Sequence, residues 1–541
     1  MASYTPTPQQ NHAVNLVGEH DFVKIDAGAG AAKTSTLALC AEQYVVPSLY
    51  LAFNKTMATE ASARFPSWVT CKTTHGQAYG VFGAPLYRKL SRPQGRYENV
   101  CGTGSEIAKY FKISGQETVM GKRITPAGIG QAVKETVNNF EYSADDRITT
   151  DHVSYSALKK ISKQDHFDVG FYKAIVVDYA NKLWTLRTNL RSNILATHDT
   201  YLKLYQLSKP DLSEYEIVYL DEAQDTNDCV LDIIKRQKKV VFVGDQRQQI
   251  YGFRGSVNAM AKIDCATGYL TTSFRFGQAV ADLANIILGK SGDGALKGWD
   301  KLNTEVLRRR DVIDMPVKHT RLYRTNAALL SDAVGLIGKG LSVNLEIDVK
   351  DFLRKLEAAV ELKNGNLAKV KHEDFLAYDN WGELADENPT GEIGRIFKIV
   401  EAGHHFEVIG VLTSHRNVDN PDIIMTTAHK SKGREWDNVV LCDDFPSAYN
   451  NEGDYVGLEE MEENLLYVAV TRAKKWLMMN STCEELVERK EQHERATSGI
   501  TVMTLGGYEG GDMAQFYINQ EMDALGDICP SAHNNMGKDW D

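Results

Sequence analysis

Short apolar runs recur in the first half of the chain, and each is followed by a stretch of helical or turn character. Apolar runs of about four to eight residues bounded by turn residues are typical of buried strands in a parallel α/β sheet. The first series reads FVKID (22–26), SLYLAF (48–53), EIVYLDE (216–222) and KKVVFVGD (238–245). A later series reads TRLYRT (320–325), FEVIGVLTS (406–414), DIIMTTA (422–428), NVVLCDD (438–444) and WLMMN (476–480). The pattern therefore predicts two α/β cores in one chain.

Two long segments interrupt these strand series. Residues 81–200 have helical spacing, as in YSALKKISKQ (155–164) and FYKAIVVDYANKLWTLRTNL (171–190), so we expect a largely helical insertion there. Residues 336–419 have mixed charge and weak periodicity, and we expect a smaller inserted domain. The predicted boundaries are 1–80 with 201–267 for the first core, 81–200 for its insertion, 268–335 with 420–500 for the second core, 336–419 for its insertion, and 501–541 for a C-terminal tail.

The composition is that of an ordinary multidomain globular protein. A length of 541 residues predicts roughly three to four domains. With 43% hydrophobic and 25% charged residues, no apolar run approaches the roughly 18 to 20 residues that a membrane span needs. The beginning, MASYTPTPQQ, lacks the basic flank and apolar region of a secretory signal. Eight cysteines without a CxxC pair predict reduced thiols in a cytoplasmic, intracellular compartment and no zinc site or disulfide framework.

The charge distribution restricts where nucleic acid can bind. A net charge of -11 does not by itself favour nucleic acid, because a strongly basic domain is the usual footprint. Nucleic acid would therefore have to bind in a local basic groove. The segments LYRKLSRPQGR (86–96) and KDFLRKL (350–356) are candidates to line it, although runs of charge are commonly solvated surfaces. The tail has seven Asp and Glu residues against one Lys, which predicts a flexible segment or a docking peptide.

The stretch VKIDAGAGAAKTSTLAL (23–39) has most features of a phosphate-binding loop. Gly28 and Gly30 allow a sharp turn between a strand and a helix, Lys33 can reach the phosphates, and the Thr34 hydroxyl can hold Mg²⁺. The position before Lys33 is Ala32, which departs from the usual pattern. Read alone, the stretch is either a nucleotide site or a plain turn from strand to helix.

Two further motifs favour the nucleotide site. EIVYLDEAQD (216–225) places Asp221 at a strand end to hold Mg²⁺, and Glu222 beside it to polarise an attacking water. Acidic pairs at strand ends are common, so this pair counts only together with the loop. VVFVGDQRQQIYGFRGS (240–256) is a further strand that ends in Gly-Asp and leads into a cluster of Gln, aromatic and Arg residues.

The ordered set of motifs resembles superfamily 1 helicases of the UvrD/Rep type, and within them the helicase core of the F-box DNA helicases. The resembling blocks are TPQQNHAV, AGAGAAKT, LAFNKTMATEA, CKTTHGQAYG, YLDEAQD, VFVGDQRQQIYGFRG, YLTTSFRFG, LYRTNAAL, TTAHKSKGREWDNV and NLLYVAVTRAKK. The resemblance implies an α/β fold with two RecA-like P-loop NTPase cores, 1A and 2A, carrying a largely helical inserted domain 1B and a small inserted domain 2B. It also implies that ATP and Mg²⁺ bind between the cores. We expect no F-box-like segment ahead of the first motif, which begins within ten residues of the start.

The resemblance also implies roles for individual residues. For the nucleotide, these are Gln10 at the adenine edge, Phe274 on the base, Gly28, Ala29, Gly30, Ala31, Ala32, Lys33, Thr34 and Ser35 at the phosphates, and Gly433 and Glu435 near the ribose. Thr34 and Asp221 are the implied Mg²⁺ ligands, and Lys33, Glu222, Gln248, Arg275 and Arg472 the implied catalytic residues, the two arginines also contacting the γ-phosphate. Without the context of the motifs, Gln10 could equally be a surface residue and Phe274 a core residue. Arg275 and Arg472 could likewise be ordinary surface residues.

A track for single-stranded nucleic acid needs aromatic faces and polar groups along the phosphates. The positions that match the family's track are Phe53, Asn54, Thr74, His75, Tyr251, Phe253 and Arg254. Phe253 stands where many relatives carry Trp, and it keeps an aromatic face. The alternatives are core packing for each aromatic residue and a structural role for His75.

Together these features predict an ATP-dependent DNA helicase or translocase, and the family resemblance implies travel in the 3′→5′ direction. It would act on single-stranded DNA and on junctions with duplex, in replication, recombination or repair, with a monomeric core and a possible protein partner at the acidic tail. One alternative is a DNA-bound interaction protein whose ATPase is weakened because the Ala32 β-carbon crowds the phosphate or forbids the backbone angle. Another is a motor directed to RNA.

Overall fold

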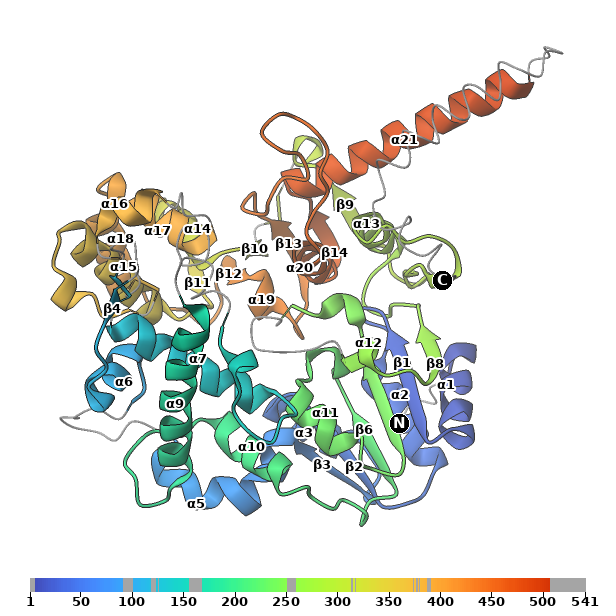
Figure 1. The fold of residues 1–541 in the computed structure, drawn as a ribbon. Coiled ribbons are helices and arrows are strands. Elements are labelled where there is room, and N and C mark those ends of the chain that lie inside the picture. Colours follow the sequence, from blue (N-terminus) through green and yellow to red (C-terminus); the bar gives the residue numbers. More distant parts are fainter. Residues whose placement is uncertain are drawn as a thin grey trace, which may run out of the picture. The chain divides into compact units, whose positions relative to one another are not determined.

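The structure is a computed structural model that describes residues 5–90, 101–117, 123–124, 126–154, 168–250, 259–312, 315–316, 318–372, 374–375, 378, 380–386 and 391–505. The chain divides into two units, Met1–Leu486 and Val487–Asp541. Among the described residues, the first unit contains two six-stranded parallel sheets flanked by helices (Figure 1). The prediction of an α/β protein with two cores is confirmed.

The first sheet has the strand order β3-β2-β6-β7-β1-β8, and every pair in it is parallel. Its strands are β1 (Phe22–Ala27), β2 (Ser48–Ala52), β3 (Val69–Thr73), β6 (Ile217–Leu220), β7 (Val240–Gly244) and β8 (Ala266–Leu270). The four apolar runs of the first series are all strands. The runs did not include β3 and β8, which are only partly buried.

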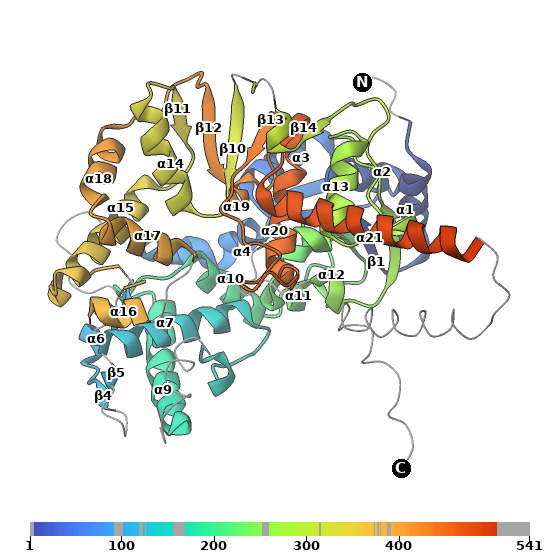
Figure 2. The same cartoon turned by 90° about the horizontal axis from the view of Figure 1, so that it is seen from above.

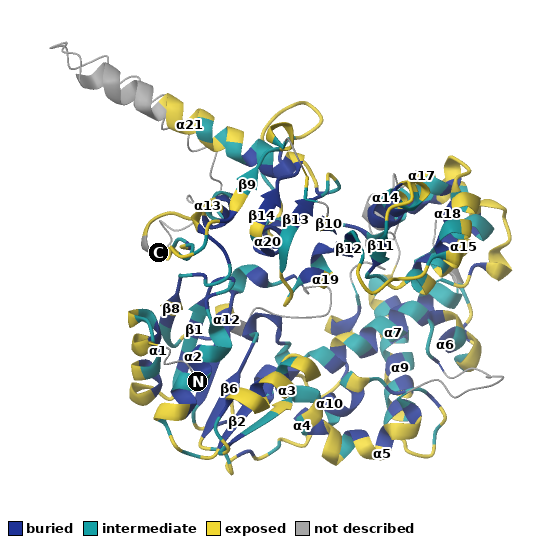
Figure 3. Cartoon of the chain, turned by 180° about the vertical axis from the view of Figure 1, so that it is seen from behind, coloured by how far each residue is buried: buried dark blue, intermediate teal, exposed yellow. Residues whose placement is uncertain are grey.

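Side chains alternate between the two faces of this sheet, as they must on extended strands. Tyr50 and Ala52 pack with α1 (Pro8–Glu19), α2 (Lys33–Gln43) and α3 (Lys55–Arg64) on one face. Leu49 and Leu51 pack with α10 (His198–Leu207), α11 (Asp228–Ile234) and α12 (Ala259–Lys262) on the other. Figure 3 shows the strands buried between helices whose outer sides are exposed. A sheet covered on both faces explains why its central strands read as continuous apolar runs.

The segment between the first strands and β6 is largely helical, as predicted. It contains α4 (Thr74–Ala78), η1 (Tyr79–Gly83), α5 (Ala84–Leu86), η2 (Tyr87–Lys89), α6 (Gly104–Phe111), β4 (Gln116–Glu117), β5 (Arg123–Ile124), α7 (Pro126–Tyr142), η3 (Thr150–His152) and α9 (Val169–Thr188). The predicted helix at 171–190 corresponds to α9, whereas the one at 155–164 lies outside the described residues. Helices α6, α7 and α9 share a separate hydrophobic cluster, which is the basis for treating this insertion as a domain. The exact boundaries of all the domains stay predictions.

The second sheet has the order β11-β12-β10-β13-β14-β9, again with parallel neighbours (Figure 2). Its strands are β9 (Glu305–Leu307), β10 (His319–Tyr323), β11 (Val343–Leu345), β12 (Ile423–Thr427), β13 (Trp436–Leu441) and β14 (Ala473–Met478). Its helices include α13 (Gln278–Ile287), α14 (Asn326–Gly338), α15 (Val349–Lys363), α16 (Trp381–Asp386), α17 (Gly391–Glu401), α18 (His405–Ser414), α19 (Ala428–Ser431) and α20 (Glu460–Val470).

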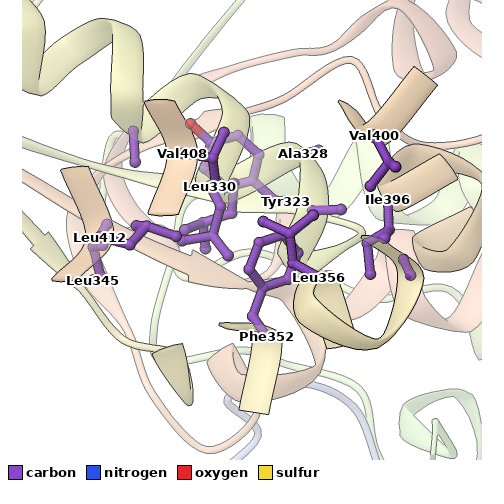
Figure 4. Close-up of a cluster of buried hydrophobic side chains, with 14 of the residues drawn as sticks. Tyr323, Ala328, Leu330, Leu345, Phe352, Leu356, Ile396, Val400, Val408 and Leu412 are labelled. Carbon is purple, nitrogen blue, oxygen red and sulfur yellow. The ribbon is translucent and has the colours of Figure 1, made fainter. Parts of the chain in front are cut away.

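One predicted strand of the second series is wrong. The run FEVIGVLTS at 406–414 forms helix α18. Val408 and Leu412, one helical turn apart, both enter the hydrophobic cluster that contains Leu330 and Leu356 (Figure 4). Burial at i and i+4 is the helical period, and packing against neighbouring helices overrides the β propensity of the valines and isoleucine.

The segment predicted as a second inserted domain shares its core with the second sheet. Strand β11 pairs with β12, and one cluster joins residues of β10, β11 and β12 to α14, α15, α17 and α18. Figure 4 shows Leu345 of β11 beside Leu412 of α18, and Phe352 of α15 in the same cluster. Residues 336–419 therefore extend the second core, and the boundaries of a domain 2B stay a prediction.

Helix α21 (Ser481–Leu505) begins in the first unit and continues into the second. It runs past residue 501, where the acidic tail was predicted to begin. The rest of the predicted tail, 506–541, lies outside the described residues. Among the residues that are described, no helix is both long and apolar enough to cross a membrane.

Candidate functional site

The predicted site residues gather at one edge of the first sheet. Because all its strands are parallel, their carboxyl ends lie at the same edge, where ligands bind in open α/β sheets. The loop 28–32 follows β1, Asp221 follows β6, and Asp245 follows β7. Phe53 and Thr74 follow β2 and β3; β2 lies next to β6, and β3 is the edge strand beside β2. The fold thus places the predicted DNA positions Phe53 and Thr74 at the same edge as the predicted nucleotide positions.

The loop between β1 and α2 turns tightly and is closely packed. The Ala31 N–H donates to the Gly28 carbonyl at 3.1 Å. Gly30 has φ +74°, and a β-carbon there would lie 2.5 Å from Ser273 Oγ and 2.8 Å from Arg275 Cβ. Only glycine at position 30 therefore lets the segment with the predicted Arg275 approach the loop.

Ala32 has φ 58° and ψ 40°, which is the left-handed conformation. It precedes the first residue of α2, and its carbonyl accepts hydrogen bonds from the Thr36 N–H at 3.0 Å and the Thr36 hydroxyl at 3.1 Å. For a residue with a β-carbon this conformation costs roughly 1–2 kcal/mol. Position 32 therefore needs the backbone angle that glycine adopts freely, and alanine adopts it here. Ser35, the third residue of α2, is half-buried.

The loop lysine and threonine meet the two acids that follow β6. Lys33 Nζ lies 2.9 Å from Glu222 Oε1 and donates to Oε2 at 3.1 Å. The Thr34 hydroxyl donates to Asp221 Oδ2 at 3.2 Å, and the Tyr50 hydroxyl donates to the same oxygen at 2.6 Å. The two predicted Mg²⁺ ligands, Thr34 and Asp221, are therefore in direct contact.

The two acids differ in their ionisation. Burial, with the charge of Glu222 beside it, raises the pKa of Asp221. Burial also acts to raise the pKa of Glu222, but the ammonium groups of Lys33 and Lys432 outweigh it and lower that pKa to about 2. Burial lowers the pKa of Lys33, yet Glu222 and Asp221 reverse this and raise it overall. Glu222 is therefore an ionised acceptor at neutral pH, and Lys33 is a cation.

Asp245 collects several donors beyond the end of β7. It is buried and accepts from the Arg247 N–H at 3.1 Å, Arg247 Nε at 3.0 Å and Gln248 Nε2 at 3.0 Å. The Tyr467 hydroxyl of α20 also donates to it, at 2.7 Å, and accepts from the Ala29 N–H at 2.9 Å. Gln248, predicted to link the phosphate to the DNA site, is thus held by Asp245.

Arg472 is a buried guanidinium held by neutral acceptors, with only 1% of its surface exposed. It donates to the Val468 carbonyl at 2.7 Å, the Arg434 carbonyl at 3.2 Å and the Thr471 hydroxyl at 2.9 Å. No carboxylate of the described residues pairs with it. Burial, with the charge of Arg275, lowers the pKa of Arg472 to about 9, which leaves it charged at neutral pH.

The second predicted arginine lies close to the first. Arg275 Nε donates to Glu435 Oε2 at 2.7 Å, and its Nη1 donates to the Thr471 carbonyl at 3.3 Å. Gly433 has φ +79°, and an added β-carbon there would meet no atom of the described residues within 4 Å. The structure therefore brings together Arg275, Glu435 and Arg472.

The two residues predicted for the base are placed by local contacts. Gln10 is buried at the third position of α1, where its side chain accepts from the Thr7 N–H at 3.0 Å and donates to the Thr36 hydroxyl at 3.0 Å. With Thr7 it forms a capping box, so the sequence T-x-x-Q also has a structural explanation. The Phe274 ring packs edge-on against Trp299 with centroids 5.6 Å apart, and it is half-buried.

One ion pair joins the blocks YLDEAQD and TTAHKSKGREWDNV. Lys432 Nζ contacts the Asp225 carboxylate and donates to the Gln248 carbonyl at 2.5 Å. Asp225 is only 8% exposed, and burial raises its pKa to about 6 in spite of the lysine. The carboxyl end of the first sheet is therefore tied to the segment after β12.

Four of the seven predicted DNA residues lie in the part of the chain that the structure describes. Phe53 is 43% exposed, whereas the Asn54 side chain caps α3 by accepting a backbone N–H at 3.0 Å. Thr74 begins α4, and His75 Nε2 lies 3.2 Å from Asp199 Oδ1. The structure brings these four together because Ala52 of β2 pairs with Thr73 of β3. Tyr251, Phe253 and Arg254 lie outside the described residues.

Several residues with central contacts were not predicted as site residues from the sequence, namely Tyr50, Asp225, Asp245, Lys432 and Tyr467. Each lies inside an apolar run or motif block that was singled out, so its neighbourhood was recognised. Tyr50 and Tyr467 look like core aromatic residues, and only their hydroxyl contacts show otherwise.

Comparison with known proteins identifies the family. Residues 6–262 match the UvrD/REP helicase N-terminal domain, and residues 403–484 match the UvrD-like helicase C-terminal domain. The chain is 31% identical to F-box DNA helicase 1 of Gallus gallus, over 90% of this chain and 50% of that protein. It is 32% identical to F-box DNA helicase protein 1 of Schizosaccharomyces pombe, over 92% of this chain and 59% of that protein. ATP-dependent DNA helicase PcrA of Leuconostoc citreum is 26% identical over 52% of this chain and 38% of its own.

The chain spans about half to three fifths of the length of its F-box relatives. The N-terminal match covers all strands of the first sheet except β8, and the C-terminal match covers strands β12 to β14 of the second. The resemblance inferred from the ten motif blocks is thereby confirmed, and the two parallel sheets are its two RecA-like cores. The chain belongs to the UvrD/Rep family of helicases.

Proposed function

We propose that this protein is an ATP-dependent DNA helicase or translocase. The observation that carries the proposal is Arg472, a buried charged guanidinium whose hydrogen-bond acceptors among the described residues are all uncharged oxygens. A buried charge is expensive unless an opposite charge or strong hydrogen bonds offset it, so such a group suits an anionic ligand. Arg275 lies close enough to affect the pKa of Arg472. Lys33 and Thr34 of the phosphate loop belong to the same ordered set of family motifs as these two arginines.

The side chains have complementary tasks in ATP hydrolysis. Glu222, ionised at neutral pH, orients and polarises the attacking water. Lys33, Arg275 and Arg472 neutralise negative charge that develops on the transferred phosphoryl group. Gln10 and Phe274 hold the base, and Glu435 and Gly433 lie at the ribose.

The donor set fits a magnesium ion. A threonine hydroxyl and a carboxylate oxygen, with phosphate oxygens and waters, are the ligands that Mg²⁺ prefers at nucleotide sites. Thr34 Oγ1 and Asp221 Oδ2, which are 3.2 Å apart, would hold it. When bound, Mg²⁺ neutralises phosphate charge and orients the triphosphate. The Tyr50 hydroxyl keeps the Asp221 carboxylate oriented.

Single-stranded DNA is the proposed track, with Phe53, Asn54, Thr74, His75, Tyr251, Phe253 and Arg254 along it. The exposed ring of Phe53, and the position of the segments after β2 and β3 at the sheet edge that carries the nucleotide residues, support this track. Stacking of a base on an aromatic side chain contributes ~1–3 kcal/mol and tolerates any sequence. We propose travel in the 3′→5′ direction and action at junctions of single-stranded and duplex DNA, in replication, recombination or repair.

ATP turnover with and without a single-stranded oligonucleotide tests the enzyme. We expect turnover that DNA stimulates and that Lys33→Ala abolishes. Turnover no higher than that of Lys33→Ala would overturn the proposal. Unwinding of duplexes with either a 3′ or a 5′ tail tests the direction, and stimulation by RNA equal to or above that by DNA at the same salt concentration would instead favour an RNA-directed motor.

A second candidate is a DNA-bound interaction protein with an attenuated ATPase. The observation that favours it is the left-handed conformation of Ala32, a strained position directly before Lys33. Tight binding of DNA without stimulated turnover, together with recovery of turnover in Ala32→Gly, would support this candidate.

We further propose that the core acts as a monomer inside the cell, where DNA is present, and that the acidic tail binds a protein partner. Light scattering after gel filtration tests the monomer. Deletion of residues 506–541 tests the tail. An unchanged set of co-purified proteins together with unchanged turnover and unwinding would count against a partner at the tail.

A further inference from the structure

Tyr467 of α20 is fully buried, and its hydroxyl makes two hydrogen bonds to the first core. It accepts from the backbone N–H of Ala29 at 2.9 Å and donates to Asp245 Oδ2 at 2.7 Å. A phenol hydroxyl has one proton to donate, and Asp245 receives it. The second core therefore reaches across to both the nucleotide loop and the end of β7 through one atom.

The first of these contacts leads to the phosphate residues. Ala29 is fully buried in the loop that ends at Lys33, and its neighbour Gly28 donates its N–H to the Leu270 carbonyl at 2.9 Å. The loop is thus held at one point by the first core and at the next residue by Tyr467. A shift of α20 is transmitted directly to the backbone of the loop.

The second contact leads toward the predicted DNA segment. Asp245 also binds Arg247 and Gln248, and we call these three residues the Asp245 cluster. The cluster lies in the same motif block as the predicted DNA residues Tyr251, Phe253 and Arg254, a few positions before them in the sequence. The backbone N–H of Asp245 donates to Gln224 Oε1 at 3.1 Å, and Gln224 Nε2 donates to Glu222 Oε2 at 2.5 Å. The cluster therefore also connects to the proposed catalytic acid.

Packing alone does not require a tyrosine at position 467. The Tyr467 ring is fully buried, and a phenylalanine ring would fill the same space without the hydroxyl. Without the hydroxyl, however, a buried N–H and a buried carboxylate would each lose a partner, which is unfavourable. The hydroxyl thus makes the positions of the loop and the cluster depend on each other.

We propose that Tyr467 is a positioning residue that couples the nucleotide loop to the Asp245 cluster, so that binding of single-stranded DNA changes the loop. The proposal rests on the proposed function. It assigns to Tyr467 the transmission step and not a contact with substrate. Such coupling needs a physical connection that both sites bias, and the two hydrogen bonds supply it.

The test compares the full chain with Tyr467→Phe and the matched variant Tyr172→Phe. Tyr172 is equally buried, but it belongs to the separate cluster of α7 and α9. Three quantities are measured with a poly-thymidine oligonucleotide. They are the stimulation of ATP turnover, the dissociation constant for the oligonucleotide, and hydrogen exchange in the peptide that covers residues 23–39.

In the wild type we expect the oligonucleotide to stimulate turnover and to slow hydrogen exchange in peptide 23–39. In Tyr467→Phe the stimulation falls at least fivefold and the exchange no longer responds to DNA, while the dissociation constant changes less than twofold. Tyr172→Phe keeps both responses. If Tyr467→Phe keeps the wild-type stimulation and exchange response, the coupling role is refuted.

Failure of the proposed function has a different signature. If DNA does not stimulate ATP turnover in the wild type, the proposed enzymatic function is refuted. If DNA still slows hydrogen exchange in peptide 23–39 of the wild type but not of Tyr467→Phe, the coupling role is supported. Should Tyr467→Phe unfold, Asp245→Asn provides the second variant, because it alters the other end of the same hydrogen bond. Unaltered exchange in that variant would also refute the proposal.

Discussion

At the scale of single residues, Ala32 is the most unusual position of the nucleotide loop. Its place in the motif was visible in the sequence, because it stands directly before Lys33. The structural effect of Ala32 could not be seen in the sequence, because a β-carbon at this position can either collide with a ligand or strain the backbone. The structure shows the left-handed angles φ 58° and ψ 40°, so the strain is in the backbone. The sequence thus identified the residue, and the conformation identified the cause.

Replacing Ala32 with glycine should stabilise the protein slightly and raise ATP turnover. Removing the β-carbon relieves roughly 1–2 kcal/mol of strain, while the extra freedom of glycine in the unfolded chain costs about 0.4–1 kcal/mol, so the net gain is about 0.8 kcal/mol. The melting temperature and kcat/KM for ATP measure the two effects.

Ala38→Gly is the matched control for this prediction. Ala38 lies inside α2, where glycine is less favourable than alanine by about 1 kcal/mol, so this variant should melt at a lower temperature. The strain argument is wrong if both glycine variants lower the melting temperature by the same amount.

At the scale of elements, α6 and α7 cross with their backbones in contact. A β-carbon on Gly130 would lie 2.0 Å from the Gly104 carbonyl oxygen, and one on Gly104 would lie 2.7 Å from the Gln131 nitrogen. Neither glycine has a turn to form, since both lie in helices. The helical pattern predicted this insertion, but the crossing depends on residues distant in sequence and was not predictable.

Gly130→Ala should destabilise the helical insertion, because the added methyl group meets backbone that cannot rotate away. Overpacking of this kind costs about 1–3 kcal/mol. Gly335→Ala, in helix α14, is the matched control, since its β-carbon would meet no described atom within 4 Å.

Alanine is better than glycine in a helix by about 1 kcal/mol, so Gly335→Ala should be neutral or stabilising. Thermal unfolding followed by circular dichroism measures both variants. A melting temperature that rises in both would show that α6 and α7 separate at no cost.

At the scale of the whole first unit, the buried pair of Lys432 and Asp225 connects the two cores. Lys432 also donates to the Gln248 carbonyl, so three motif blocks meet at one ammonium group. Truncating one partner of a buried pair is costly because the other charge stays buried. We therefore expect this pair to matter more than the exposed pairs elsewhere on the molecule.

Lys432→Met should lower stability by about 3 kcal/mol at pH 8 and by less at pH 5.5. Burial already raises the pKa of Asp225 to about 6, and loss of the lysine raises it further. Between the unfolded and folded pKa values the folded state binds more protons, so stability falls as pH rises through that window. In Lys432→Met the folded pKa of Asp225 is higher, so this pH range extends above pH 6. The loss of stability relative to the wild type therefore grows toward pH 8.

The melting temperature at pH 5.5 and pH 8 measures this difference. Lys432→Met combined with Asp225→Asn should recover much of the loss, because no charge is left buried. Arg309→Met, which breaks an ion pair with Asp443 at a more exposed place, should change stability by less than about 1 kcal/mol. A deficit of Lys432→Met that does not depend on pH would contradict the buried pair as its cause.

The sequence by itself determined the family, the two α/β cores, eight of the nine predicted strands and the order of the motif blocks, because each depends on a local period or a short ordered pattern. The tertiary structure decided the rest. It made 406–414 a helix, since packing of Val408 and Leu412 outweighs β propensity. It also decided that Tyr467 and Lys432 reach the nucleotide loop and Asp225, because parallel pairing and helix packing join residues far apart in the chain, and no local pattern records such a distance.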